Sequence, residues 1–402
     1  MELLLNADVY TPEPVGRRHL VIGGGRLLFM GERAPEVPRE LLAGTLDLEG
    51  RRVVPGLIDG HVHLTGGGGE AGAATRVPPL PLSSITLGGV TTVVGVLGTD
   101  DLTRTPAGLL AAARGLAEEG LNAFCLTGGY HVPPATITGS VRGDIVHIDR
   151  ILGVGEVAIS DHRSSQPTLD EILHLAGEAH VAGLMTHKAG ILHLHLGDGV
   201  RGLELVRKSL ESSEIPPRVF NPTHINRRKA LFDEALDLAR KGCTVDVTAF
   251  PVEDGEDAYS AEEGVMRYLD AGLPAERLTV SSDGGGCLPT FDGEGRVAKM
   301  DVGKPAALAH TLRALLERGC PLERALPPFT SNPARLLRLA GKGSIRTGAD
   351  ADLVVLNEDH RVRDVMVRGR WFVRRGRPAI LGTFEAPEQR PPAGPGAKGE
   401  QS

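Results

Sequence analysis

The chain changes its hydrophobic pattern near residue 53 and again near residue 340. Its first fifty residues predict short strands, because brief apolar runs alternate there with polar, glycine-containing turns. Short strands return after Leu339, with an apolar run at residues 353–356 and a hairpin around Arg368-Gly369-Arg370. We therefore predict a small β domain of the sandwich type, built from both chain ends, residues 1–53 and 341–385.

Between these ends, apolar runs of four to eight residues alternate with amphipathic stretches of ten or more. Strands are expected at residues 91–96, 123–127, 191–196, 218–222, 244–248 and 278–281. Helices are expected at residues 109–119, 200–211, 229–241 and 304–318. Buried strands that alternate with helices indicate βα units and a parallel sheet. Seven or eight such units over residues 54–340 favour a TIM-type (β/α)8 barrel over an open doubly wound sheet.

Composition limits the kinds of partner and the cellular compartment that are expected for this chain. The chain is 41% hydrophobic and 24% charged, as in globular proteins, and its net charge of −7 without a long basic run argues against nucleic acid. It contains no apolar stretch of about 18 residues, so no membrane partner is expected. Four scattered cysteines and no signal-peptide pattern predict reduced thiols and a cytoplasmic location. Residues 386–402, rich in Pro, Gly and charge, are expected to be disordered.

The strongest chemical signal lies at residues 55–64, PGLIDGHVHL. On a strand, His61 and His63 point to the same face, so both imidazoles can reach one metal ion. Zinc accepts such nitrogen ligands, and Asp59 is placed to orient one of them. A bare His-x-His could be only a polar strand end, but the preceding residues favour a metal site.

That segment resembles the signature of the amidohydrolase superfamily, and further blocks resemble its isoaspartyl (β-aspartyl) dipeptidase family. In chain order these blocks are HLTGGGGEAG at residues 63–72, GTD at 98–100, TGGYHVP at 127–133, ISDHRS at 159–164, HLGD at 195–198, PTHINR at 222–227 and SSDG at 281–284. The resemblance extends to about residue 385. It implies a barrel enzyme with two zinc ions per subunit, a small dipeptide substrate and assembly into a homo-oligomer.

The resemblance also implies the other metal ligands. His195 and His224 end apolar runs and Asp283 follows one, where barrel strands deliver side chains to the catalytic face. Two cations roughly 3.5–4 Å apart also need a bridging anion. The family commonly uses a carboxylated lysine on the fourth barrel strand, but the aligned position here holds Glu156. Its shorter side chain requires the strand to move inward, which a bulge at Gly155 would permit. Alternatives are a single-metal site or a different lysine, Lys188.

Charged residues in the same blocks predict the substrate contacts. Guanidinium groups suit carboxylates, so Arg163 and Arg227 match the two carboxylates of an isoaspartyl dipeptide, while Glu70 matches its free ammonium. Tyr130 is similar to the family tyrosine that polarises the scissile carbonyl. Further expected contacts are Gly68, Thr99 and Cys287, the last standing where well-known members have a serine.

Together these features predict hydrolysis of the β-aspartyl peptide bond of dipeptides. A metal-bridging hydroxide would attack the carbonyl carbon, and Asp283 would pass its proton to the leaving amine. The products would be aspartate and an amino acid. A cyclic amide hydrolase, such as a dihydroorotase or hydantoinase, is the main alternative, although Glu70 and its glycine loop fit a dipeptide better. A non-catalytic scaffold is disfavoured because the metal ligands are all present.

Overall fold

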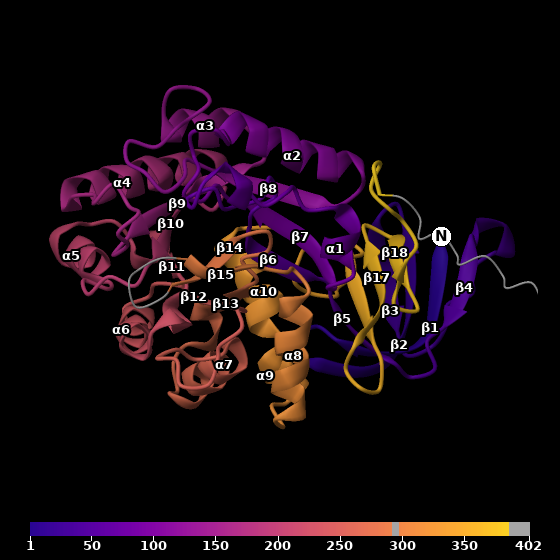
Figure 1. The fold of residues 1–402 in the computed structure, drawn as a ribbon. Coiled ribbons are helices and arrows are strands. Elements are labelled where there is room, and N and C mark those ends of the chain that lie inside the picture. The colour runs from indigo at the N-terminus through magenta and orange to yellow at the C-terminus, as the bar shows by residue number, and fades with distance from the viewer. Residues whose placement is uncertain (292–296, 386–402) are drawn as a thin grey trace, which may run out of the picture.

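The computed structural model describes residues 1–291 and 297–385, which form a curled parallel sheet and a flanking β-sheet (Figure 1). The tail that was expected to be disordered, residues 386–402, lies outside the described residues. In Figure 1 the C-terminal strands β17 (Val362–Val367) and β18 (Arg370–Arg374) lie beside the N-terminal strands. The prediction that both chain ends contribute to one β structure is therefore confirmed.

The flanking sheet has nine strands in a single hydrogen-bonded array. Its other strands are β1 (Glu2–Tyr10), β2 (Pro14–Gly23), β3 (Arg26–Gly31), β4 (Gly44–Asp47), β5 (Arg52–Pro55), β16 (Leu353–Leu356) and β19 (Arg377–Pro378). Strand β5 joins the two chain ends, since it pairs parallel with β1 and antiparallel with β16. Because of this double pairing, strands from both chain ends form one continuous hydrogen-bonded sheet. Leu4, Leu20, Leu353 and Met366 are buried in its core.

The parallel strands follow the chain in sequence. They are β6 (Leu57–Val62), β7 (Val90–Gly95), β8 (Asn122–Thr127), β9 (Ile151–Ile159), β10 (Ile191–Leu196), β11 (Phe220–Thr223), β12 (Val245–Thr248) and β13 (Leu278–Ser281). The first six form one sheet in chain order, and β12 pairs with β13. A parallel bridge between Val62 and Gly284 brings the segment after β13 back beside β6. The strands therefore curl into a partial barrel.

Helices lie outside these strands (Figure 1). The α-helices are α1 (Leu82–Thr86), α2 (Pro106–Glu118), α3 (Val141–His147), α4 (Leu169–Thr186), α5 (Glu204–Ser212), α6 (Lys229–Arg240), α7 (Ala261–Asp270), α8 (Ala307–Glu317), α9 (Leu322–Ala325) and α10 (Ser331–Leu336). In α2, Leu109, Ala113 and Leu116 recur at helical spacing and are buried in the core that also contains Val93.

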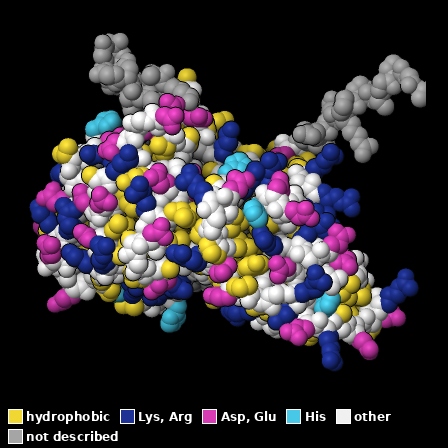
Figure 2. Space-filling model, turned by 90° about the horizontal axis from the view of Figure 1, so that it is seen from below, with side chains coloured by type: hydrophobic (Ala, Val, Ile, Leu, Met, Phe, Trp, Pro, Cys, Tyr) yellow, Lys and Arg dark blue, Asp and Glu magenta, His cyan; other side chains and the backbone are white. Residues whose placement is uncertain are grey.

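Short elements complete the chain. The 3-10 helices are η1 (Arg39–Leu41), η2 (Ala73–Thr75), η3 (Pro217–Val219), η4 (Ile225–Arg227), η5 (Ala275–Arg277) and η6 (Pro327–Phe329). A hairpin of β14 (Cys287–Phe291) and β15 (Val297–Val302) follows β13. Within the described ranges, none of the helices combines the length and hydropathy needed to span a membrane. Figure 2 shows acidic and basic side chains interspersed on the face seen from below, in keeping with the lack of a basic run.

Candidate metal centre

Two histidines at the end of β6 begin the centre. His61 is a strand residue and His63 follows the strand, and their rings lie 5.4 Å apart between centroids. Both are buried, at 0% and 5% exposure. The same-face arrangement that their spacing predicted is therefore present.

Glu156 reaches these histidines from the middle of β9. Leu192 and Leu194 of β10 pair with Val154 and Val157 of β9, so β9 holds one additional residue between the two pairs. Gly155 within this bulge has a φ of +144°, and a Cβ there would lie 2.5 Å from the carbonyl oxygen of His193. Only glycine fits this close approach, so the bulge expected at Gly155 depends on that residue.

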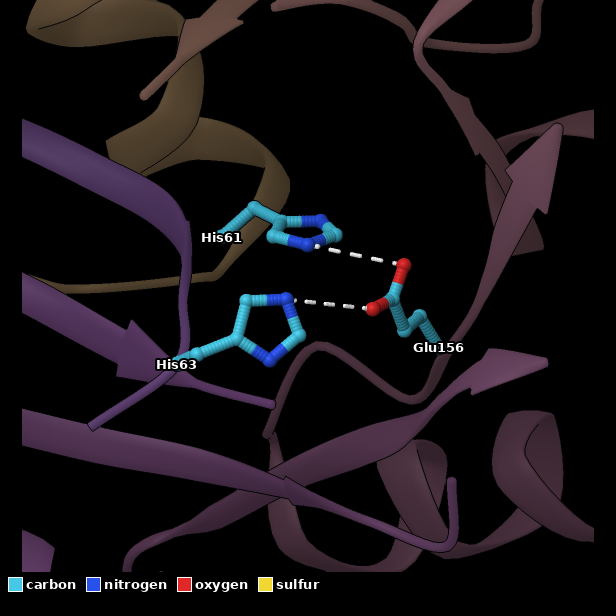
Figure 3. Close-up of side chains that lie close together, drawn as sticks. All are labelled: His61, His63 and Glu156. Carbon is cyan, nitrogen blue, oxygen red and sulfur yellow. Dashed lines mark ion pairs between the residues drawn. The ribbon is translucent and has the colours of Figure 1, made fainter. Parts of the chain in front are cut away.

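The Glu156 carboxylate lies among four imidazoles. Oε1 is 3.4 Å from Nε2 of His63, and Oε2 is 3.5 Å from Nε2 of His61. Figure 3 shows both rings facing the carboxylate. Oε2 is also 3.0 Å from Nδ1 of His195 and 3.6 Å from Nε2 of His224. One carboxylate thus stands between two pairs of histidines.

These side chains form overlapping sets with metal-ligand spacing. The sets are His61, His63 and Glu156; His61, His224 and Asp283; and Glu156, His195 and His224. The first and third sets share only Glu156. Nε2 of His61 and Oδ1 of Asp283 are buried without a hydrogen-bond partner, as atoms reserved for an ion would be. The cluster is therefore consistent with a binuclear metal site bridged by Glu156.

The electrostatics of the cluster favour bound cations. Burial alone would lower the pKa of His61, but the carboxylates of Glu156 and Asp283 outweigh burial and raise it to about 9. Burial would raise the pKa of Asp283, yet the His63 imidazole, whose Nε2 lies 3.0 Å from Oδ1, outweighs burial together with His61 and lowers it to about 2. The carboxylates are thus held ionised in a buried site that stabilises positive charge.

His61 is oriented by a series of hydrogen-bonded side chains that the sequence analysis did not predict. Nδ2 of Asn221 donates to the carbonyl oxygen of Thr244 at 2.8 Å, so Oδ1 of Asn221 accepts from Nδ1 of His193 at 2.7 Å. Burial lowers the pKa of His193 to about 3, so its Nε2 remains an acceptor. Nδ1 of His61, 2.9 Å away, must then keep its hydrogen, so Nε2 of His61 is the nitrogen that would release its own hydrogen and bind an ion.

The hydrogen bond between His193 and His61 leads to a prediction about metal affinity. His193→Leu removes the acceptor for His61, and we expect the affinity for the first ion to fall about 10- to 100-fold. His193→Gln keeps an acceptor oxygen and should lose less. Competition between the metal-free protein and a zinc chelator measures both values. Equal affinity of the leucine variant and the wild type would contradict the orienting role of His193.

Asp59 fixes the backbone rather than an imidazole ring. Its Oδ1 accepts hydrogen bonds from the backbone amides of Ser282 at 3.1 Å and of His61 at 3.4 Å, and Oδ2 accepts one from the Ser282 hydroxyl. Asp59 therefore ties the end of β6 to the segment that carries Asp283. The expectation that it orients a ligand holds through the main chain.

A cavity of about 470 Å³ opens onto the cluster of candidate metal ligands. The predicted site residues that line it are His63, Gly68, Glu70, Thr99, Tyr130, Glu156, Arg163, His195, Arg227, Asp283 and Cys287. Lining residues without a predicted role are Gly67, Gly98, Asp198, Phe250, Pro251, Glu253, Glu256, Ala258, Leu288 and Asp301. Residues 250–258 follow β12 directly, so the rule that strand ends carry the site could have found them.

Tyr130 and Cys287 face this cavity with their protons retained. The Tyr130 hydroxyl lies 2.9 Å from Nδ1 of His195, and burial raises its pKa well above the usual value of 10. It can therefore donate a hydrogen bond. Burial also raises the pKa of the Cys287 thiol to about 11, and its Sγ lies 3.8 Å from Sδ of Met300. A protonated thiol is a poor nucleophile, as expected for a contact residue.

The alternative bridging lysine lies elsewhere. Nζ of Lys188 donates to the carbonyl oxygens of Ile145 at 2.5 Å and Ile148 at 2.7 Å, both of which precede β9. Lys188 therefore anchors the loop before β9, and the histidine cluster remains consistent with a bridge by Glu156.

Known proteins resemble this chain over most of its length. Residues 52–372 match the amidohydrolase family. The solved β-aspartyl dipeptidase of Fervidobacterium islandicum AW-1, in complex with a β-Asp-Leu dipeptide, is 41% identical, with 96% of this chain and 98% of that chain covered and a TM-score of 0.89. A D-hydantoinase from Thermus sp. is 16% identical, with 96% and 98% covered and a TM-score of 0.66, which shows the fold alone.

Curated relatives are more distant. An adenine deaminase of Geobacillus kaustophilus (strain HTA426) is 24% identical over 387 residues, and the match covers 89% of this chain but only 53% of that protein. This chain thus spans about half of that relative. An imidazolonepropionase of Anaeromyxobacter sp. (strain K) is 27% identical over 380 residues, with 84% of this chain and 83% of that protein covered.

Proposed function

Because this chain belongs to the amidohydrolase family and is a homologue of β-aspartyl dipeptidase, we propose that it hydrolyses isoaspartyl dipeptides with two bound zinc ions. Aspartate and an amino acid are released. One observation carries the proposal: the Glu156-centred metal cluster opens onto the cavity that Glu70, Arg163 and Arg227 line. The hydrolytic centre and the charges that complement an isoaspartyl dipeptide thus meet in one place.

The substrate is recognised by its three charges. An isoaspartyl dipeptide carries one ammonium group and two carboxylates. Glu70 complements the ammonium, and the guanidinium groups of Arg163 and Arg227 complement the carboxylates. Gly68, Thr99 and Cys287 provide the remaining contacts along the cavity wall. This pairing supports a dipeptide over a cyclic amide, which has no free ammonium group.

The protein side chains position and move protons during the reaction. His61, His63 and Asp283 would hold one ion, His195 and His224 the other, with Glu156 between them. When bound, the ions supply Lewis acidity and lower the pKa of water from 15.7 to about 7. Tyr130 donates a hydrogen bond to the carbonyl oxygen of the scissile bond. The ionised Asp283 accepts the proton of the attacking water and passes it to the leaving amine.

The proposal includes the finer architecture. The parallel strands would close as a (β/α)8 barrel over residues 54–340, and residues 1–53 and 341–385 would form the small β domain. The bridge between Val62 and Gly284 supports closure. Assembly into a homo-oligomer remains a prediction from the family resemblance.

Hydrolysis of β-aspartyl-leucine by the zinc-loaded enzyme tests the proposed function. α-Aspartyl-leucine, dihydroorotate and N-acetyl-β-aspartyl-leucine serve as matched comparisons, the last because it lacks the ammonium that Glu70 would bind. We expect rapid cleavage of the β-linked dipeptide alone, measured as released leucine. Ring opening of dihydroorotate without dipeptide cleavage would replace this function with that of a cyclic amide hydrolase.

A further inference from the structure

Asp161 connects a metal-site histidine to a substrate-site arginine. It lies two residues beyond the end of β9, the strand that also carries Glu156, and is 4% exposed. Its Oδ2 lies 3.1 Å from Nε2 of His195 and accepts a hydrogen bond from Nη2 of Arg163 at 2.8 Å. Its Oδ1 accepts from Nε of Arg163 at 3.0 Å and from the Arg163 backbone amide at 2.7 Å.

The contact with Arg163 fixes the guanidinium plane. Two parallel hydrogen bonds from Nε and Nη2 form the bidentate geometry that suits a carboxylate. Only Nη1 points away from Asp161, and it lies 3.3 Å from Oε1 of Glu70. Arg163 is therefore presented to the cavity in one orientation, between the carboxylate that holds it and the carboxylate predicted to bind the substrate ammonium.

The contact with His195 decides which ring nitrogen carries the hydrogen. An ionised carboxylate can only accept, so Nε2 of His195 donates to Asp161. Nδ1, which lies 3.0 Å from Oε2 of Glu156, is then the nitrogen that would give up any hydrogen and bind an ion held together with Glu156. A carboxylate behind a metal-binding histidine fixes the ring and makes it more basic.

The neighbouring chain leaves room for this side chain. A Cβ on Gly197, which directly follows β10, would lie 2.5 Å from both Cβ and Oδ2 of Asp161. No real Cβ fits at that distance, so glycine at this position permits the Asp161 carboxylate to reach His195. A substitution at Gly197 can therefore disturb the contact between Asp161 and His195 without altering any charge.

We propose that Asp161 is a positioning residue that serves both halves of the site, orienting His195 for the second metal ion and Arg163 for a substrate carboxylate. The metal half rests on geometry alone, and the substrate half rests on the proposed function. Substrate binding and metal binding thus depend on one buried carboxylate.

Asp161→Asn tests the proposal, because the NH2 group of the amide faces donor hydrogens in either orientation. At the Oδ2 position it faces His195 Nε2 and Arg163 Nη2, and at the Oδ1 position it faces Nε and the backbone amide of Arg163. We expect the affinity for the second zinc ion to fall about 10- to 100-fold, measured by equilibrium dialysis of the metal-free protein. At saturating zinc we expect kcat for β-aspartyl-leucine to recover more fully than KM, because Arg163 stays misoriented. Gly197→Ala, which displaces the carboxylate, should reproduce both effects.

Two control variants distinguish the effect on metal binding from the effect on substrate binding. Asp170→Asn makes the same chemical change at an exposed position of α4 and should behave as the wild type. Arg163→Met should raise KM without lowering the affinity for zinc. Wild-type zinc affinity in both Asp161→Asn and Gly197→Ala, or an unchanged KM in both, would overturn the proposal. If the wild type fails to cleave β-aspartyl-leucine, the proposed function fails, whereas dialysis still decides the metal half.

Discussion

Glu156→Ala is expected to bind no more than one zinc ion per subunit and to lose roughly 10³-fold or more in kcat. The variant removes a carboxylate that lies within 3.6 Å of His61, His63, His195 and His224. Without it, two cations face each other with no bridging anion from the chain, and the second ion is lost. One ion supplies several kcal/mol of transition-state stabilisation, and each 1.4 kcal/mol corresponds to about tenfold in rate.

Metal stoichiometry of the purified variant and turnover of β-aspartyl-leucine measure these losses. Lys188→Met is the matched control, since it removes the rival lysine while keeping most of its stem, and it should retain both ions. Acetate nearly matches the atoms that Glu156→Ala removes, so it should partly restore ion binding. A variant that kept two ions and full activity would exclude Glu156 as the bridge.

Asp283→Asn is expected to keep its metal ions but to lower kcat by about 10²- to 10⁴-fold, the usual effect of losing a general acid–base group. Asparagine preserves the shape and an oxygen ligand. It also tolerates the left-handed backbone at this position, where φ is +51°. What it cannot do is accept the proton of the attacking water and deliver it to the leaving amine.

A substrate with a less basic leaving group isolates that proton transfer. β-Aspartyl-p-nitroanilide releases an amine that needs less protonation, so Asp283→Asn should be impaired less on it than on β-aspartyl-leucine. Metal content is measured on the same samples. Equal impairment on both substrates would assign Asp283 to metal binding alone, and unimpaired turnover would remove it from the mechanism.

Local pattern predicted much of the architecture. The expected strands at residues 191–196 and 278–281 have the bounds of β10 and β13, because apolar residues recur at every second position in both. The hairpin β14–β15 was missed, as was helix α4. The single nine-stranded sheet depends on β5 pairing with partners about 45 and 300 residues away, and such long-range pairing leaves no local signature.

The site was predicted where residue type and spacing carry the chemistry. His61 and His63 follow from strand periodicity, whereas Glu156 required the family resemblance. His193 was overlooked although His193 and His195 repeat the same i, i+2 spacing, so the signal was present in the sequence. Asp161 left no comparable signal, because its role depends on Arg163 folding back beside it and on Gly197 leaving space.

The proposed bridge by Glu156, at the bulge after Gly155, would also make the centre independent of carbon dioxide. A lysine becomes a bridging carbamate only by reacting reversibly with carbon dioxide, so its bridge forms after translation and decomposes in acid. Glu156 follows the additional residue in β9 and needs no such modification, because its carboxylate is present as soon as the chain is synthesised. With Glu156 as the proposed bridge, assembly of this centre would depend on metal supply alone and would be indifferent to bicarbonate.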